Sequence, residues 1–131
     1  MTPAITPTDI PRPSGFSYAF SATGDRSVYF AGHTAVDREG HIVGPGDVVA
    51  QFEQALRNLK STAEAAGVGL GDLVKLTLFV TDVEAYKTKS QEIGVIYRRF
   101  FGSHYPAMSL VGVQRLWDGQ AMIEIEGVAV H

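Results

Sequence analysis

The sequence predicts an α+β fold in which two helices cover one face of a mixed sheet. Apolar residues recur at helical spacing in two long segments, 48–66 and 83–101, whereas shorter segments alternate apolar and polar residues. The expected order is two strands, a short third strand, a helix, a strand, a second helix and two final strands. With 131 residues and no repeat or linker, the chain is expected to form one domain, residues 1–131.

The N-terminal third predicts a proline-punctuated lead-in followed by a hairpin. Residues 1–14 contain four prolines, which cannot donate ladder hydrogen bonds. Segments 16–22 and 27–31 mix aromatic and small residues around a Gly-Asp turn, so they are expected to pair with each other. The glycine-rich loop that follows is expected to contain a short strand at 41–43.

The remaining elements have clear boundaries in the sequence. Asp47 is expected to cap the first helix and Gly67 to close it. Asp82 is expected to cap a second, continuous helix that runs through Phe101, with Gly102 after it. The other strands are predicted at 74–80, 108–113 and 122–130.

The last predicted strand carries carboxylates and apolar residues on one face. Glu124 and Glu126 lie two residues apart and alternate with isoleucines, so the carboxylates are expected to point away from the helices. Periodicity alone is consistent with a solvated face. However, Met122, Val128 and Val130 share that face, which indicates that a second copy of the chain covers it.

Composition excludes several kinds of site. The chain has no cysteine, so it cannot form disulfides, thiolate nucleophiles or cysteine-based zinc sites. Its four histidines do not fall at helical metal-ligand spacing, and no metal site is expected. A net charge of −3 without a basic run argues against nucleic acid and anionic membranes as partners. No apolar stretch is long enough to span a bilayer, and a cytoplasmic location is expected.

Six segments, which together span most of the chain, resemble one known family. They are 29–33, 48–67, 72–82, 97–101, 105–113 and 123–126. These segments are similar to those of the RidA (YjgF-type, L-PSP endoribonuclease-like) family of imine and enamine deaminases. The resemblance implies a chorismate-mutase-like fold and a homotrimer with small-molecule clefts between its subunits. It also implies hydrolysis of an imine with release of ammonia, without a metal or organic cofactor.

The resemblance also places the cleft, which differs here from that of the deaminating members. Their water-orienting glutamate is kept as Glu124, the expected catalytic residue. Their carboxylate-binding arginine falls at Met108, and their cleft tyrosine, serine and cysteine fall at apolar residues. The expected ligand-binding residues are Phe16, Ala31, His33, Met108, Ser109 and Leu110. Because methionine cannot form the bidentate contact that arginine forms with a carboxylate, a neutral or apolar ligand is expected.

Two other functions stay open. Loss of the arginine favours a trimer that binds a small molecule without catalysis, whereas retention of Glu124 favours a deaminase. Some family members are described as endoribonucleases, but an acidic chain without a basic patch argues against RNA cleavage. His33 and His104 could bring a positive charge to the cleft, although a structural or solvent-facing role is the simpler interpretation. Arg98 and Arg99 are expected to be solvated.

Overall fold

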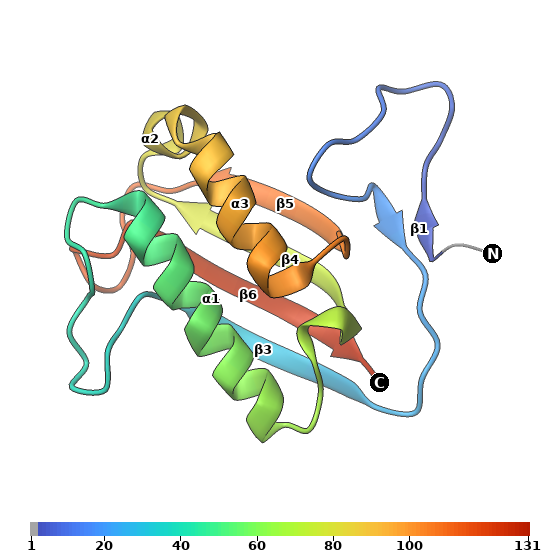
Figure 1. Ribbon diagram of the computed structural model, residues 1–131, viewed down its shortest axis with the longest axis horizontal. Helices are drawn as coiled ribbons and strands as arrows, with labels where there is room; N and C mark the ends of the chain where they lie inside the picture. Colours follow the sequence, from blue (N-terminus) through green and yellow to red (C-terminus); the bar gives the residue numbers. More distant parts are fainter. Residues whose placement is uncertain (1–2) are drawn as a thin grey trace.

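In the computed structural model, which describes residues 3–131, the long helices lie side by side across one face of a mixed sheet (Figure 1). Within these residues the main sheet has four strands in the order β3-β6-β4-β5. They are β3 (Ser27–His33), β6 (Ile123–Val130), β4 (Leu73–Val80) and β5 (Ala107–Gly112). β6 is antiparallel to both of its neighbours, and β4 and β5 run parallel. The predicted α+β class, with helices on one face, is confirmed.

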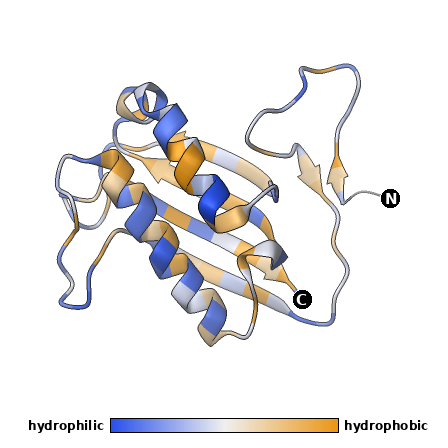
Figure 2. Ribbon diagram, viewed as in Figure 1, coloured by the Kyte–Doolittle hydropathy of each residue, from blue (hydrophilic) through white to orange (hydrophobic). Residues whose placement is uncertain are grey.

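The first helix, α1 (Val48–Ala65), begins and ends where its sequence predicts. The Asp47 carboxylate accepts a hydrogen bond from the Ala50 N–H at 3.0 Å, which satisfies one of the free donors of the first turn. After the helix, Gly67 adopts a φ of +76°, a conformation that glycine accepts without steric cost. The outer surface of α1 is hydrophilic, and apolar residues dominate the strands beneath it (Figure 2).

The second predicted helix is two helices, so the expectation of one continuous helix is wrong. α2 (Val83–Thr88) and α3 (Ser90–Phe101) are separated at Lys89, whose φ and ψ of −98° and 16° depart from helical values. Asp82 caps α2 as predicted, and Gly102 follows α3 with a φ of +63°. α2 contains no fully buried residue, whereas α3 buries four, so burial contributes less to the short α2 segment than to α3.

The predicted N-terminal hairpin is also wrong. β2 (Ala19–Phe20) pairs with β1 (Ala4–Ile5) instead of with β3. Ser17 explains the difference, because its N–H donates to the Pro106 carbonyl at 3.1 Å and it bridges to Ala107. These bonds hold the N-terminal segment against the start of β5, at the opposite edge of the sheet from β3 (Figure 1).

Two smaller predictions concern loops. The first two residues of the predicted lead-in 1–14 lie outside the described residues, and Ala4–Ile5 forms β1 within it. The strand expected at 41–43 is reduced to a single bridge between Val36 and Ile42. No helix within residues 3–131 has the length and hydrophobicity needed to cross a membrane.

Strand β6 separates the two faces of the sheet. Ile123 and Ile125 are 0% and 1% exposed beneath the helices, while the alternating Glu124 and Glu126 project to the other face. We call this second face, which no helix within residues 3–131 covers, the open face. Tyr29 lies on it, is 78% exposed, and pairs in register with Val128 of β6.

Candidate functional site

A cavity of about 420 Å³ lies between the helices and the sheet, and we call it the α3–β5 cavity. Its volume is in the range typical of small-molecule sites. Side chains of β4, β5 and β6 line it from the sheet, and side chains of α1, α2 and α3 line it from the helices. Ser14 and Gly15 of the N-terminal segment also line it, because the bonds of Ser17 hold that segment beside β5.

Apolar side chains form the floor of the cavity. Leu76 and Met108 are register partners on the parallel strands β4 and β5, so both project toward the helices. Leu78 follows on the same face and also lines the cavity. Met108, at the position where the resemblance expects an arginine, therefore adds apolar surface to a site that is already apolar.

Tyrosines form the wall above this floor. Tyr97 stacks between Tyr105, at 5.1 Å between ring centroids, and Phe101, at 4.5 Å. Its hydroxyl donates to the His104 carbonyl at 2.9 Å. Burial raises the pKa of Tyr97, and burial raises the pKa of Tyr86 to about 12. Both phenols therefore stay neutral at physiological pH, and the Tyr86 hydroxyl is available to a ligand as donor or acceptor.

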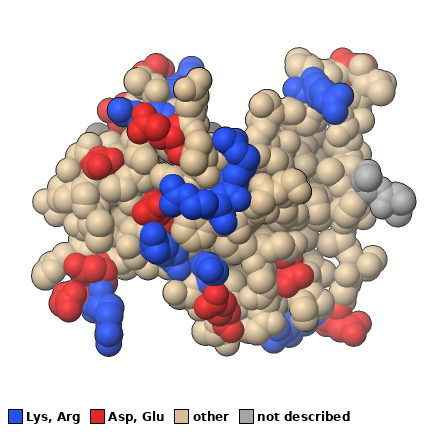
Figure 3. Space-filling view, viewed as in Figure 1, with Lys and Arg blue, Asp and Glu red and all other residues tan. Residues whose placement is uncertain are grey.

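Arg98 of α3 brings the cavity its positive charge. Its guanidinium lies above Gly94, one turn earlier in the helix, where an added Cβ would meet the Nη1 atom at 3.3 Å. Gln91, a further turn back, lines the cavity as well. Basic side chains gather over the helices on this side of the molecule (Figure 3). Arg98 is exposed, as expected from the sequence. The sequence did not indicate that its side chain also lines the cavity.

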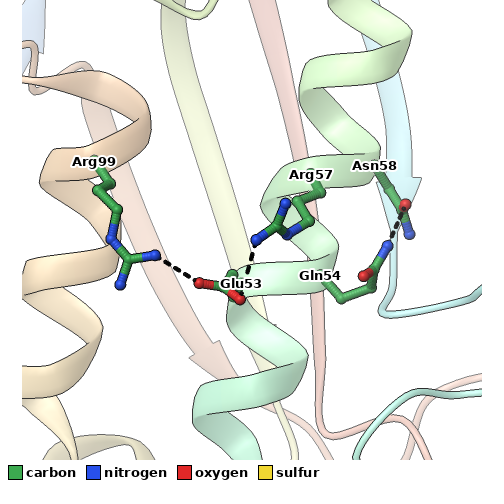
Figure 4. Close-up of polar contacts among 5 residues, drawn as sticks. All are labelled: Glu53, Gln54, Arg57, Asn58 and Arg99. Carbon is green, nitrogen blue, oxygen red and sulfur yellow. Dashed lines mark hydrogen bonds and ion pairs between the residues drawn. The ribbon is translucent and has the colours of Figure 1, made fainter.

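The neighbouring Arg99 points elsewhere. Its guanidinium donates to the Glu53 carboxylate at 2.9 Å, and the same carboxylate lies 3.4 Å from Arg57 (Figure 4). This ion-pair cluster joins α3 to α1 on the outer surface. Arg98, in contrast, has no ion pair with any residue of the described chain.

Glu124 lies on the open face, away from the α3–β5 cavity. It pairs in register with Phe79, and its carboxylate covers Gly32 at the end of β3. A Cβ at Gly32 would come within 2.5 Å of the Glu124 carboxylate carbon, so a larger residue there would displace this carboxylate. Within residues 3–131, the Glu124 carboxylate makes no side-chain hydrogen bond or ion pair, which leaves it available to water or a ligand.

The other predicted site residues are dispersed. Phe16 packs edge-on against Tyr18 at 5.2 Å and faces a shallower hollow near the N-terminus. Ser109 is on the open face, where its hydroxyl accepts a hydrogen bond from Lys75 at 3.2 Å. Leu110 is 38% exposed on the edge strand β5, and Ala31 is exposed near the end of β3.

Two histidines that could have supplied charge are held by other contacts. The ring nitrogens of His33 lie 2.6 Å from the Ala31 carbonyl oxygen and 2.8 Å from Thr62 Oγ1. His104 Nε2 lies 2.6 Å from the Leu73 carbonyl oxygen. Neither lines the α3–β5 cavity. Residues 3–131 also contain no cluster of three or more histidine, aspartate or glutamate side chains placed to hold a metal ion.

The structure thus brings Met108 into the cavity and leaves the other predicted site residues outside it. Sequence reasoning missed the polar wall, namely Tyr86, Gln91 and Arg98. Spacing could have indicated that wall, because residues 91, 94 and 98 fall on one face of a helix. That this face borders a cavity depends on tertiary packing, which the spacing alone did not indicate.

Comparison with known proteins gives a consistent result. Residues 11–131 match the family described as "Endoribonuclease L-PSP". A 90-residue segment is 44% identical to the 2-iminobutanoate/2-iminopropanoate deaminase of Escherichia coli (strain K12). The segment covers 66% of this chain and 66% of that protein, which is just under two thirds of each.

Solved structures are similar over nearly the whole chain. The crystal structure of YyfB, of the conserved Rid protein family from Yersinia pestis, has a TM-score of 0.83 and 34% identity. The similarity covers 98% of this chain and 97% of that one. E. coli TdcF, solved with bound serine, has a TM-score of 0.68 and 30% identity, with 99% and 92% of the two chains covered.

Proposed function

Because the chain belongs to the endoribonuclease L-PSP family, which includes the Rid proteins, we propose that it is a hydrolytic deaminase of small-molecule imines or enamines. The name of its E. coli relative, an iminobutanoate and iminopropanoate deaminase, supports this reaction class. The observation that carries the proposal is the unpaired Glu124 carboxylate, held over Gly32 at the margin of the open face.

The proposed reaction needs one group that handles water. Water adds to the imine carbon while Glu124 accepts one of its protons, so a carbon–oxygen bond forms. The protonated nitrogen then leaves as ammonia, and the carbonyl product remains. A carboxylate without a competing ion pair suits this role, because it can accept the proton and then return it to the leaving nitrogen.

We further propose that the site is completed between subunits of a homotrimer. Met108 lies on edge strand β5 and faces the helices, whereas Glu124 lies beside edge strand β3 and faces the opposite side. One copy therefore cannot place both at one ligand. In a closed ring, the open face near β3 of one copy would approach the β5 edge of the next, so that Glu124 of one copy and Met108 of the other border a shared cleft.

The proposed substrate has an apolar body. Leu76, Leu78 and Met108 present hydrocarbon and thioether surface to the cavity, and tyrosine rings form the facing wall. Burial of apolar surface against such walls contributes about 25 cal/mol per Å² to binding. Methionine also adapts its shape to irregular ligands.

Substitution of Glu124 by glutamine tests the proposed reaction. Imines generated in situ from a panel of amino acids by an amino-acid oxidase would be offered to the protein, with ammonium release as the readout. We expect Glu124→Gln to lower kcat by about 100-fold or more, since an amide cannot accept the proton. Glu126→Gln is the matched control, because Glu126 lies two residues along the same face. Equal activity of Glu124→Gln and the unmodified protein would refute the assignment.

The alternative is a trimer that binds a small molecule without turning it over. Met108 favours this alternative, because the deaminating members of the family carry arginine at this position. Binding of a product analogue without ammonium release from any imine of the panel would support the alternative.

A further inference from the structure

We propose that Arg98 is the anion-binding residue of the α3–β5 cavity, so that the ligand carries a carboxylate in spite of Met108. The ligand class is then a 2-imino acid with a bulky apolar side chain. The imine part of this statement rests on the proposed function, whereas the carboxylate part rests on the cavity itself.

The residues that line the cavity have one charge among them. Those the structure describes include no aspartate, glutamate, histidine or lysine, and Arg98 is the one ionised group. Leucine, methionine and tyrosine side chains surround it and leave it without a competing acid. A cation at the rim of an apolar cavity attracts an anionic group more strongly than one in bulk water, because the local dielectric constant is lower.

Gly94 allows Arg98 to lie at the cavity. Glycine in the middle of a helix is unfavourable by roughly 0.5–1 kcal/mol relative to alanine. Here the missing side chain leaves room for the guanidinium, since a Cβ at position 94 would lie only 3.3 Å from Nη1. Gln91, on the same helix face, adds an amide donor to the lining of the cavity.

The contacts of the other arginines of this region distinguish Arg98. Arg99 and Arg57 share the Glu53 carboxylate. Arg115 donates to the carbonyl groups of Leu116 and Trp117. Arg98 makes no such contact with any residue of 3–131, so its guanidinium donors are free to bind a carboxylate in a bidentate geometry.

This assignment revises the neutral ligand that the sequence predicts. That expectation followed from the loss of a cation on β5, at Met108. The structure shows a cation on α3 instead, across the cavity from the same strand. The carboxylate would therefore bind at the helix side, while the space next to Met108 would take the apolar side chain.

Equilibrium binding tests the inference without requiring turnover. The probes are 4-methyl-2-oxopentanoate, the hydrolysis product of the imine of leucine, and its neutral amide, 4-methyl-2-oxopentanamide. Titration calorimetry or NMR would give both dissociation constants. We expect the unmodified protein to bind the acid at least about 10-fold more tightly than the amide, because a charge-assisted hydrogen bond is lost with the amide.

The variants locate the anion site. Arg98→Gln should remove the preference for the acid and leave binding of the amide within about twofold, whereas Arg98→Lys should keep part of the preference. Arg99→Gln is the matched control, since its side chain points to Glu53, and it should bind both probes like the unmodified protein. Gly94→Leu, which would crowd the guanidinium, should weaken binding of the acid more than binding of the amide.

Several outcomes would overturn the inference. They are equal binding of acid and amide by the unmodified protein, absence of binding of both, and an acid preference that survives in Arg98→Gln. Urea unfolding of each variant separates loss of the site from loss of the fold. If the acid preference depends on Arg98 but no imine is hydrolysed, the anion site stands and the proposed deaminase activity fails.

Discussion

Gly32 limits the position of Glu124 through the absence of a side chain. The glutamate carboxylate occupies the space that a Cβ at Gly32 would take, with a separation of only 2.5 Å. Gly32 is not among the glycines with positive φ, so alanine would fit the backbone and would clash only with the flexible end of Glu124. A substitution at Gly32 can therefore move the Glu124 carboxylate without straining the backbone.

Substitution of Gly32 by alanine should affect activity far more than stability. The added methyl group displaces the Glu124 carboxylate, and a displacement of about 1 Å in a catalytic group can cost up to 100-fold in rate. We expect kcat/KM for the imine substrate to fall by roughly 10- to 100-fold, while the free energy of unfolding changes by less than about 1 kcal/mol. Ammonium release and urea unfolding would measure the two effects. A large loss of stability would show that the contact is structural.

At the scale of elements, sequence patterns predicted the helix ends that are determined by residues within one turn. The cap at Asp47 and the glycine at Gly67 gave α1 its ends, because these groups act within one turn of the helix. Pairing of the N-terminal segment could not be predicted in the same way. It depends on bonds from Ser17 to Tyr105 and Pro106, nearly ninety positions away, and no periodicity encodes such contacts.

The short helix α2 contacts the core through Tyr86, whose ring packs against Phe52 of α1 at 6.2 Å between centroids. Burial raises the pKa of Tyr86 to about 12, while the unfolded chain has a value near 10. Above pH 10 the unfolded state releases the phenolic proton and the folded state retains it. The unfolded state then binds fewer protons, so stability falls as pH rises from about 10 to about 12.

Replacement of Tyr86 by phenylalanine should flatten this alkaline dependence. The contribution of one tyrosine is at most about 1.4 kcal/mol per pH unit in this window. Urea midpoints at pH 9 and pH 11.5 for the unmodified protein and Tyr86→Phe would measure it, and Tyr18→Phe, in the exposed N-terminal segment, is the control. An equal alkaline loss in both variants would mean that Tyr86 ionises as freely in the fold as outside it.

At the scale of the whole molecule, the candidate site could be predicted only in part. The resemblance drew attention to Met108 and Glu124, but a linear sequence does not say on which face of a sheet each projects. Register and edge placement put them on opposite faces. Arg98 was missed because an arginine on a helix surface is usually solvated, and only the cavity beside it distinguishes it from Arg99.

The proposed trimer can be tested by a substitution on the open face. Tyr29 is 78% exposed there, beside Val128, and such an apolar surface is typical of a contact with another copy of the chain. In sedimentation velocity at micromolar concentration, the unmodified protein should migrate as three copies of the 14.1 kDa chain. Tyr29→Arg should migrate as a single copy, because it places a charge in the proposed interface at no cost to the core. Ser61→Arg adds the same charge on the exposed helical side and should leave the assembly unchanged.

Ammonium release from the same variants tests whether the copies complete each other's sites. They do so if Tyr29→Arg reduces ammonium release in proportion to the loss of trimer. If isolated copies remain active, Glu124 and the α3–β5 cavity do not act on one substrate.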